Sequence, residues 1–515
     1  MSPGTTDYDF VIIGAGSAGC AAAYRLQKAG IGTIAVLEAG PTNRVPQVKI
    51  PFGLAWTRGS KRDWKFETVD QPALGNRRIA VTRGKMLGGS SSINSMVWFR
   101  GRRDDFDNWN VPGWSWQEVE ADFEAVEAQT KPRRFETAHP LSEAFALALG
   151  DNGHAPPNPE RESAGVFHKN LHNGARWSAA DAFLRPAERT GDVSVIKGAN
   201  VDRIEFDGTT AKTVKLIDGR RIQARRGILL SAGSIGSPSI LMRSGVGPAD
   251  QLKELGIAIT AHSADIGSNL HDHPAVGLHF RGDATGYGLE LRQFPHWAVS
   301  PFNWLFRRKG RLTSPVVEAG AFFRALPVGE DGDDRPDCQS HFIPTMVGYK
   351  GSFITWGSGY SADVNVCRPT SRGSLKLKSS DPDDYPIVDL GLLSDPKDLE
   401  ILKFGVRRLR KILDAAPFEG LRGVEAYPGT DKQSDEEIEQ FVRDRCATAY
   451  HPVGTVRMGA DDAPVAPNMK VRGVQNLWVA DASIMPAVTT ANTNAPSMMI
   501  GYRAAGMIAD QLAKD

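Results

Sequence analysis

The sequence predicts an α/β protein, α+β overall, in which a Rossmann-type dinucleotide-binding domain is joined to a second domain with a mixed, largely antiparallel sheet and helices. Three observations support this prediction. A glycine-rich strand–turn–helix–strand unit lies near the N-terminus, short alternating strand patterns recur in the second half, and an apolar strand and a helix end the chain. The 515 residues are also too many for one ordinary core, so at least two domains are expected.

The first unit spans residues 9–39. An apolar run is followed by Gly14, Gly16 and Gly19, a helix-favouring stretch over residues 18–29, and a second apolar run that finishes on Glu38. The three glycines allow a tight turn, a close approach of the backbone to a pyrophosphate, and close packing of helix on strand, in that order. The N-terminus of the helix offers unpaired N–H groups to the phosphates. This pattern predicts a bound dinucleotide.

The acidic residue at the end of the unit restricts which dinucleotide is expected. A carboxylate at Glu38 can accept hydrogen bonds from an adenosine ribose, and it disfavours NADP because that ribose carries a phosphate. It does not separate NAD from FAD. The remaining alternative is a glycine-rich turn in some other α/β protein.

The middle of the first half contains fewer regular elements. An amphipathic helix is expected over residues 116–128, whereas 131–176 are rich in His, Pro, Asn and Gly and are expected to form loops. The strand patterns that follow fit a small antiparallel piece that returns to a buried parallel strand, and they cover residues 193–196, 201–206, 213–217 and 228–232.

The pattern changes near residue 279, where short alternating strands begin to recur. Amphipathic helices are expected over 396–415 and 436–445, and the chain ends with a strand over 476–480 and a helix over 497–512. We therefore expect four segments: 1–155 and 156–278 as two parts of the cofactor domain, 279–445 as the substrate domain, and 446–515 as a return to the cofactor domain that carries the catalytic pair.

Composition excludes several classes of protein. The net charge of +1 provides no strong field for nucleic acid or an anionic membrane, and no apolar run is long enough for a membrane span. The four cysteines have no CxxC spacing, and the histidines flanking Asp272 have no suitably spaced third ligand, so no metal site is expected. Scattered thiols and the absence of a signal peptide predict a cytoplasmic protein.

Several separated motifs carry a family resemblance. Residues 84–100 read GKMLGGSSSINSMVWFR, residues 231–248 read SAGSIGSPSILMRSGVGP, and residues 451–459 read HPVGTVRMG. Together with the N-terminal fingerprint and the NTNAP stretch at 492–496, they resemble the glucose–methanol–choline (GMC) family of flavin oxidoreductases. The resemblance covers nearly the whole chain. It implies a discontinuous Rossmann-type FAD domain, bound FAD, and oxidation of an alcohol to an aldehyde or ketone.

The resemblance also implies the catalytic pair. Removal of a hydroxyl proton needs a base with a pKa near working pH, which suits imidazole, and His451 matches the catalytic histidine of the family. The alternative is a structural histidine. The second member is a His or an Asn in the family; by position it is Asn494, with Asn492 as a competing candidate. Asn494 could instead, or in addition, cap the helix that begins near Pro496.

By the same resemblance, Asn94 contacts the flavin ring, Val201 meets the adenine, and Asp481 and Ala482 contact the ribityl or pyrophosphate part. Ile93 stands where some choline-oxidising relatives have a histidine linked to the flavin, so non-covalent FAD is expected. The full set of expected cofactor-binding residues is Gly14, Gly16, Ser17, Gly19, Glu38, Ala39, Gly88, Ser92, Asn94, Val201, Ala232, Asp481 and Ala482.

Aromatic side chains bear on the substrate. Tyr450 adjoins His451 and could point into the cavity. A cluster of Phe294, Trp297, Phe302, Trp304 and Phe306 could line or cover the substrate pocket, or could equally form the core of the second domain or a subunit contact. If several of these rings face the cavity, an aromatic or otherwise apolar primary alcohol is favoured.

The predicted function is FAD-dependent oxidation of a primary alcohol, with an aromatic one among the candidates, by hydride transfer to flavin N5. Electrons then pass to O2 or another acceptor, and neither a nucleic-acid partner nor a membrane span is expected. The alternatives are a hydroxynitrile-lyase-like enzyme, a light-driven fatty-acid decarboxylase and an NAD-dependent dehydrogenase. The oligomeric state stays open.

Overall fold

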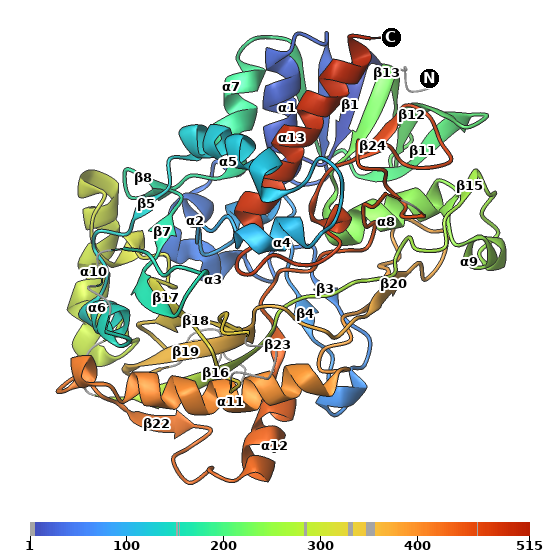
Figure 1. Cartoon of the computed structure of the whole chain (residues 1–515). Helices are drawn as coiled ribbons and strands as arrows, with labels where there is room; N and C mark the ends of the chain where they lie inside the picture. The colour runs from blue at the N-terminus through green and yellow to red at the C-terminus, as the bar shows by residue number, and fades with distance from the viewer. Residues whose placement is uncertain are drawn as a thin grey trace.

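The computed structural model describes residues 6–150, 153, 155–282, 286–327, 333–346, 356–460 and 462–514. Within these ranges the chain forms two seven-stranded sheets with helices around them. The N-terminal and C-terminal parts of the chain build the first sheet, and the middle of the chain builds most of the second (Figure 1). The predicted mixed α/β architecture is confirmed.

The first sheet is parallel except for one edge. Its strand order is β10-β2-β1-β13-β12-β11, and β24 pairs with the last three residues of β13. The antiparallel edge comes from β11 and β12. The strands are β1 (Thr6–Ile13), β2 (Ile34–Glu38), β10 (Val193–Lys197), β11 (Val201–Asp207), β12 (Thr210–Leu216), β13 (Arg221–Leu230) and β24 (Leu477–Val479).

Two helices from opposite ends of the chain pack side by side against this sheet (Figure 1). They are α1 (Ser17–Lys28) and α13 (Asn494–Leu512). A Cβ atom on Gly501 would lie only 2.2 Å from the carbonyl oxygen of Ala18, so α13 can approach α1 this closely only because residue 501 is glycine. This contact fixes the C-terminal segment beside the glycine-rich turn.

The second sheet is antiparallel throughout, with the order β22-β16-β19-β18-β17-β6 and with β23 on β16. Helix α11 (Pro396–Leu413) crosses one face (Figure 1). Its Gly405 lies against Val364 and Cys338. The strands are β6 (Ser163–Val166), β16 (Pro274–Arg281), β17 (Ala319–Phe323), β18 (Cys338–Ile343), β19 (Gly359–Val366), β22 (Val424–Tyr427) and β23 (Ala447–Thr448).

Side chains alternate across each strand, so the face opposite α11 carries the next residues along, including Gln339 and His341 of β18 and Asp363 of β19. This second face turns toward the first sheet and forms one wall of the cavity described below. The alternation of side chains along β18 and β19 therefore places polar residues on the face that is turned toward the dinucleotide fingerprint.

The remaining elements are shorter. Paired short strands are β3 (Phe66–Glu67) with β4 (Ala80–Val81), β5 (Arg133–Arg134) with β7 (His168–Lys169), β8 (Leu171–His172) with β9 (Ala175–Arg176), β14 (Val246–Gly247) with β15 (Ala261–His262), and β20 (Ser374–Lys376) with β21 (Ile387–Asp389). The other α-helices are α2 (Pro46–Lys49), α3 (Leu54–Thr57), α4 (Arg103–Asp107), α5 (Trp116–Thr130), α6 (Pro140–Leu147), α7 (Arg185–Glu188), α8 (Gly233–Arg243), α9 (Ala249–Glu254), α10 (Phe294–Phe302) and α12 (Asp435–Arg445).

Two features differ from the sequence-based expectations. Residues 131–176 were expected to be loops, but they contain α6 and several short strands. Strand β6 lies in the segment expected to belong to the cofactor domain, yet it pairs with β17 of the second sheet. The four predicted domain limits themselves stay a prediction. No helix within the described ranges is both long enough and apolar enough to pass through a bilayer.

Candidate active site

A cavity of about 870 Å³ lies between the carboxyl ends of the parallel strands of the first sheet and the polar face of the second. The turn after β1 contributes Gly14 and Gly16, and β2 ends on Glu38 at its wall. The second sheet contributes His341 and Asp363. Open α/β sheets bind ligands at this end of their strands, so the cavity is the candidate site for cofactor and substrate together.

The backbone around the three glycines of the fingerprint is compatible with the roles that the sequence predicts. Gly14 has a φ of +101°, and a Cβ there would lie 2.4 Å from the carbonyl oxygen of Ser231. A Cβ on Gly16 would meet nothing within 4 Å, so this backbone faces open space where a pyrophosphate can approach. A Cβ on Gly19 would lie 2.0 Å from the carbonyl oxygen of Gly14, so Gly19 allows the helix to pack on the turn.

Glu38 is almost fully buried at the edge of the cavity. Its carboxylate accepts the N–H groups of Ala15 at 3.2 Å and Gly40 at 2.8 Å. Burial raises the pKa of this carboxyl group, while the two N–H donors and the nearby Lys85 act in the opposite direction. The side chain is thereby held at the end of β2, in the position that a ribose-binding acid requires.

Ten of the thirteen predicted cofactor-binding residues line the cavity, and they are Gly14, Gly16, Ser17, Glu38, Ala39, Asn94, Val201, Ala232, Asp481 and Ala482. Gly19, Gly88 and Ser92 do not. Ser92 is turned away from the cavity, and its hydroxyl donates to the carbonyl oxygen of Leu87 at 2.7 Å. The neighbouring Gly89 and Ser90 line the cavity instead. The sequence predicted that the loop around residues 88–94 contributes to the cavity, but it did not predict which residues of the loop face the cavity.

His451 follows β23 and lines the cavity. Its backbone N–H donates to a carboxylate oxygen of Asp272 at 2.9 Å, and the Thr448 hydroxyl donates to the other oxygen. Tyr450 has a φ of +68°, a conformation that non-glycine residues rarely adopt. It also lines the cavity, as its position beside His451 suggested. The Asp272 carboxylate therefore fixes the backbone that presents the imidazole.

Both ring nitrogens of His451 meet polar partners. Nε2 lies 3.1 Å from the side-chain nitrogen of Asn492, and Nδ1 lies 3.1 Å from Nδ1 of His273. The carbonyl oxygen of the Asn492 side chain accepts the Gln339 side-chain N–H at 3.3 Å, which turns the amide nitrogen toward the imidazole. In this arrangement Nε2 is the acceptor and Nδ1 carries the proton, which it donates to His273.

The surroundings keep His451 neutral. Its pKa lies well below the ordinary value of 6.5, chiefly because the ring is buried, and also because His273, His341 and Arg83 disfavour a further positive charge. Burial likewise lowers the pKa of His273 to about 3. A neutral imidazole with an unprotonated nitrogen can accept a proton at neutral pH.

Asn494, the expected partner of His451, is engaged elsewhere. Its side-chain oxygen accepts the Ser17 hydroxyl at 2.8 Å, and it is the first residue of α13. Asn492, the competing candidate, is the residue whose amide meets the His451 ring. Both asparagines line the cavity, but they lie in different parts of it: one beside the fingerprint turn, the other beside the imidazole.

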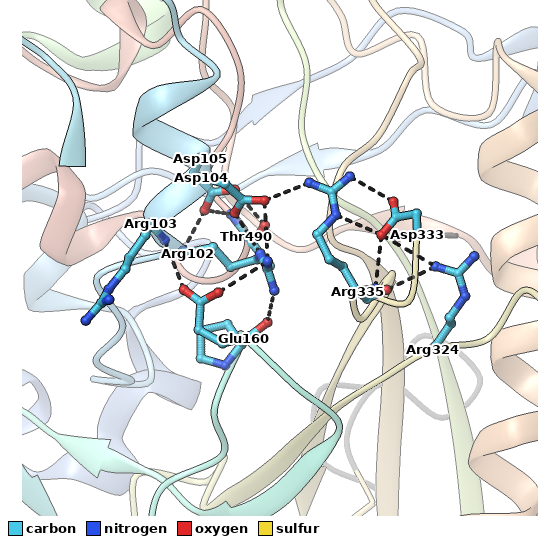
Figure 2. A network of polar contacts seen from close by, with 10 residues as sticks. Arg102, Arg103, Asp104, Asp105, Glu160, Arg324, Asp333, Arg335 and Thr490 are labelled. Atoms are coloured by element: carbon cyan, nitrogen blue, oxygen red, sulfur yellow. Dashed lines mark hydrogen bonds and ion pairs between the residues drawn. The ribbon is translucent and has the colours of Figure 1, made fainter. Parts of the chain in front are cut away.

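The loop that carries Asn492 is tied to the rest of the protein by Asp105 (Figure 2). This buried carboxylate accepts the backbone N–H of Thr490 at 2.6 Å and its hydroxyl at 2.7 Å, together with the N–H of Arg102 at 2.8 Å. Ala491 has a φ of +139°, which favours glycine. Strained backbone of this kind persists only where surrounding contacts stabilise it, and here the hydrogen bonds from Thr490 to Asp105 do so.

The same network reaches the second sheet (Figure 2). Asp104 accepts from Arg102 at 2.7 Å and from Arg335 at 2.7 Å, and Arg335 also binds Asp333 at 2.8 Å. Arg335 lies shortly before β18, the strand that carries Gln339 and His341. Hydrogen bonds therefore connect the start of α4 with the Asn492 loop, and ion pairs connect it with the segment that leads into β18, the strand that orients Asn492.

The part of the cavity beyond His451 mixes polar and apolar groups. His341 lies 3.1 Å from a carboxylate oxygen of Asp363, and His279 lies 2.9 Å from the Ser361 hydroxyl. Of the cluster Phe294, Trp297, Phe302, Trp304 and Phe306, no member lines the cavity, whereas Trp64, Phe66 and Tyr385 do. The argument from that cluster to an aromatic substrate therefore loses its basis.

Within the part of the chain that the structure describes, no three His, Cys, Asp or Glu side chains are grouped so as to hold a metal ion. The two histidines that flank Asp272 are engaged with the protein. His271 Nε2 accepts the N–H of Val488 at 2.9 Å, and its Nδ1 lies 2.6 Å from the carbonyl oxygen of Asn269. His273 contacts His451.

Comparison with known proteins places the fold and the site in context. The family model described as GMC oxidoreductase matches residues 8–275 with its N-terminal part and 369–501 with its C-terminal part. An oxygen-dependent choline dehydrogenase of Rhizobium etli and an alcohol dehydrogenase [acceptor] of Pseudomonas putida are each 37% identical, with 97% of this chain and 95% of the relative covered.

Solved structures agree. A formate oxidase superposes with a TM-score of 0.89 at 26% identity, covering 98% of this chain and 99% of that one. A pyridoxine 4-oxidase from Mesorbium loti superposes with a TM-score of 0.84 at 27% identity, covering 97% and 98%. The similarity thus extends over both sheets and includes the segment that carries His451 and Asn492.

Proposed function

This chain belongs to the GMC oxidoreductase family, and we propose that it oxidises a primary alcohol to an aldehyde with His451 as the general base. The enzyme uses FAD and acts on CH–OH groups. The observation that carries the proposal is the contact of the neutral, buried imidazole with Asn492 inside the same cavity that the dinucleotide fingerprint lines. This location supports proton removal next to a redox cofactor.

The residues around the cavity fit FAD. Gly16 leaves an open cradle for the pyrophosphate, Glu38 stands at the end of β2 for a ribose, and Asn94 and Asp481 lie further along the wall. Bound FAD supplies the hydride acceptor at flavin N5, while the protein supplies binding, position and base. Ile93 lines the cavity and has no nucleophilic atom, which supports non-covalent binding.

We assign the proton transfer to one atom. Nε2 of His451 accepts the hydroxyl proton of the alcohol after the substrate hydroxyl has replaced the Asn492 N–H at the one lone pair of this nitrogen, and Nδ1 stays bound to His273. The Asn492 amide has a second N–H in addition to the one that faces Nε2, and it can donate this N–H to the substrate oxygen. His273 acts as a positioning residue because its contact with Nδ1 keeps the unprotonated nitrogen toward the cavity.

The residues that line the cavity restrict the identity of the alcohol less than they restrict the type of reaction. Val316 and Ile343 give part of the wall an apolar character, whereas His279, His341 and Asp363 give another part a polar one. The relatives carry the names of choline and alcohol dehydrogenases, which supports a primary alcohol without selecting one. Electrons then pass to O2 or another acceptor.

Anaerobic mixing of the FAD-loaded enzyme with a panel of alcohols tests the proposal. We expect at least one primary alcohol to bleach the flavin, and the product to be the matching aldehyde. Subsequent admission of air measures reoxidation and separates O2 from another acceptor. A flavin that no alcohol bleaches, in an enzyme that cleaves hydroxynitriles, would favour the lyase alternative instead.

A further inference from the structure

The helix α10 and the π-helical turn η6 (Asn303–Arg307) that continues it present apolar side chains outward. The inward stripe is Gln293, Trp297, Ser300 and Trp304, spaced four, three and four residues apart. The outward residues are each between 52% and 80% exposed; they form the apolar helix face and are Leu291, Phe294, Val299, Phe302, Leu305 and Phe306. A surface helix normally exposes polar residues to solvent, whereas this helix exposes apolar ones.

Positive charge surrounds the apolar helix face. Residues 291–317 contain Arg292, Arg307, Arg308, Lys309 and Arg311 but no Asp or Glu. Within the described ranges none of these five cations forms a salt bridge with a carboxylate, and the Arg311 guanidinium donates to the side-chain oxygen of Gln293. Arg308 lies over the Trp304 ring at 4.1 Å, and Arg311 lies over the Trp297 ring at 5.4 Å. Residues 291–317 therefore carry five positive charges and no negative one, in a chain whose net charge is only +1.

The helix is held firmly on its inner side. The indole N–H of Trp304 donates to the carbonyl oxygen of Gly174 at 2.8 Å, and that of Trp297 donates to Gly288 at 2.9 Å. The Trp297 ring packs on Phe52 at 5.1 Å. These inward contacts use the indoles and leave the six apolar side chains of the outer face without cover. A loosely attached lid would not be anchored in this way.

We propose that the apolar helix face is a binding surface for a lipid bilayer with anionic headgroups. Apolar and aromatic side chains on one face, with arginine and lysine beside them, are the features of helices that lie in the membrane interface. The exposed cations Arg292, Arg307, Arg308 and Lys309 would meet the headgroups while the phenylalanines enter the acyl boundary. The helix lies at the periphery of the molecule, where a flat surface can reach it (Figure 1).

A second copy of the chain fits this surface less well. In a two-fold symmetric dimer the same patch meets itself, so the cations of residues 291–317 in one copy would face those of the other around the contact. Like charges juxtaposed in this way oppose association. An anionic bilayer instead supplies both the apolar phase and the opposite charge.

The inner side of the helix also connects with the reaction cavity. Trp304 shares one apolar cluster with Val316 and Ile343, and these two residues line the cavity wall. This apolar cluster would therefore separate a bilayer bound at the apolar helix face from the reaction cavity. The binding itself does not depend on the identity of the alcohol.

Cosedimentation of the FAD-loaded protein with vesicles tests the proposal. The two probes are vesicles of phosphatidylcholine alone and of phosphatidylcholine mixed with phosphatidylglycerol. We expect binding to the mixed vesicles, weaker binding to phosphatidylcholine alone, and a loss of binding as salt rises. The wild-type protein alone is sufficient for this comparison, so it does not depend on any variant folding.

Variants localise the surface. Phe302→Ser with Phe306→Ser, and Arg307→Glu with Lys309→Glu, are each expected to lower the vesicle partition coefficient by about tenfold or more. The controls change exposed groups of the same kind elsewhere: Phe404→Ser with Val424→Ser, and Arg189→Glu with Lys253→Glu. The controls should bind as the wild type does. Turnover of an alcohol in buffer should stay unchanged in all four.

Three results would overturn the proposal. The first is no binding of the wild type to phosphatidylglycerol vesicles at low salt. The second is equal loss of binding in the variants and the controls, which would indicate a non-specific attraction. The third is a dimer in sedimentation velocity that Phe302→Ser with Phe306→Ser dissociates, without vesicle binding, which would assign the face to a second copy.

Discussion

The imidazole of His451 is held by two side chains that act on opposite nitrogens. Asn492 approaches Nε2 and His273 approaches Nδ1, each at 3.1 Å. The two contacts are not interchangeable, because the Asn492 amide donates a hydrogen bond to Nε2 whereas His273 accepts one from Nδ1. The pair accounts for which nitrogen is unprotonated and can act as a base, and it leads to predictions that separate neighbouring residues.

The first prediction separates the two asparagines. Asn492→Ala should lower the rate of flavin reduction by about 10-fold to 100-fold, because it removes a charge-neutral donor next to the reacting oxygen. Asn494→Ala should leave that rate nearly unchanged and weaken FAD binding instead, since it removes the contact with Ser17 at 2.8 Å. Stopped-flow reduction and FAD titration of both variants measure the two effects. The reverse pattern would restore Asn494 as the catalytic partner.

The second prediction concerns pH. Burial and the neighbouring His273, His341 and Arg83 hold the pKa of His451 well below 6.5, so the base stays unprotonated as pH falls through 6.5. With an alcohol that has no titratable group, kcat/KM should therefore remain flat on lowering the pH to 6.5, and should decline only below that value. A protonation step at or above pH 6.5 that limits kcat/KM would contradict this assignment.

The sequence identified His451 from its motif but could not select between Asn492 and Asn494. Asn492 lies just before α13 and Asn494 is its first residue, and both are compatible with the motif. The choice between the two asparagines depends on the path of the chain from Thr490, which Asp105 binds, to α13, including the φ of +139° at Ala491. This conformation depends on a hydrogen bond to a residue nearly four hundred positions away, which no local pattern records.

At the scale of elements, the contact of α1 with α13 joins the two ends of the chain. The third prediction tests it. Gly501→Ala places a Cβ 2.2 Å from the backbone oxygen of Ala18, which cannot move without displacing α1, so the free energy of unfolding should fall by about 1–3 kcal/mol. FAD affinity should fall as well, because α1 begins at the phosphate-binding turn.

Gly506→Ala is the matched control on the same helix. Its Cβ would meet the guanidinium of Arg25, the far end of a flexible side chain, at 2.6 Å. We expect no loss of stability, and a gain of up to about 1 kcal/mol from helix propensity. Thermal unfolding of both variants gives the comparison. Equal destabilisation would show that the helix, and not its approach to α1, is sensitive to the substitution.

Elements with a clear hydrophobic period were predicted close to their observed bounds. Helix α1 was expected over 18–29 and runs from Ser17 to Lys28, because its apolar face is buried along its whole length. Helix α6 was missed, although Pro140 at its start and Glu143 in its first turn are helix-start signals. The polar and proline-rich surroundings obscured a helix that is stabilised by burial of Leu141 and Phe145.

At the scale of the molecule, the site exists only where the two sheets meet. The parallel sheet brings the cofactor-binding turn, and the antiparallel sheet brings Gln339 and His341. The sequence predicted both sheets and their discontinuous order. It could not predict that the aromatic cluster near residue 300 lies outside the cavity, because that depends on how α10 packs on Phe52 and Tyr287.

The fourth prediction is made for the whole enzyme. FAD should be released intact when the protein is denatured, because Ile93 at the cavity wall cannot form a covalent bond to the flavin. After precipitation of the chain, the flavin absorbance should be found in the supernatant. Digestion of the pellet with protease is the control. Flavin-labelled peptides recovered from the pellet would show a covalent link at another residue.

The most direct test of the account is the rate at which an alcohol reduces the flavin, without oxygen and in a single turnover, in the wild type and in His451→Ala. We predict that the variant retains FAD and loses roughly 10²–10⁴-fold in this rate, since general-base catalysis contributes about that much. His296→Ala, an exposed histidine on α10, is the control and should react as the wild type does. A His451→Ala enzyme that reduces its flavin at the wild-type rate would contradict the assignment of the base.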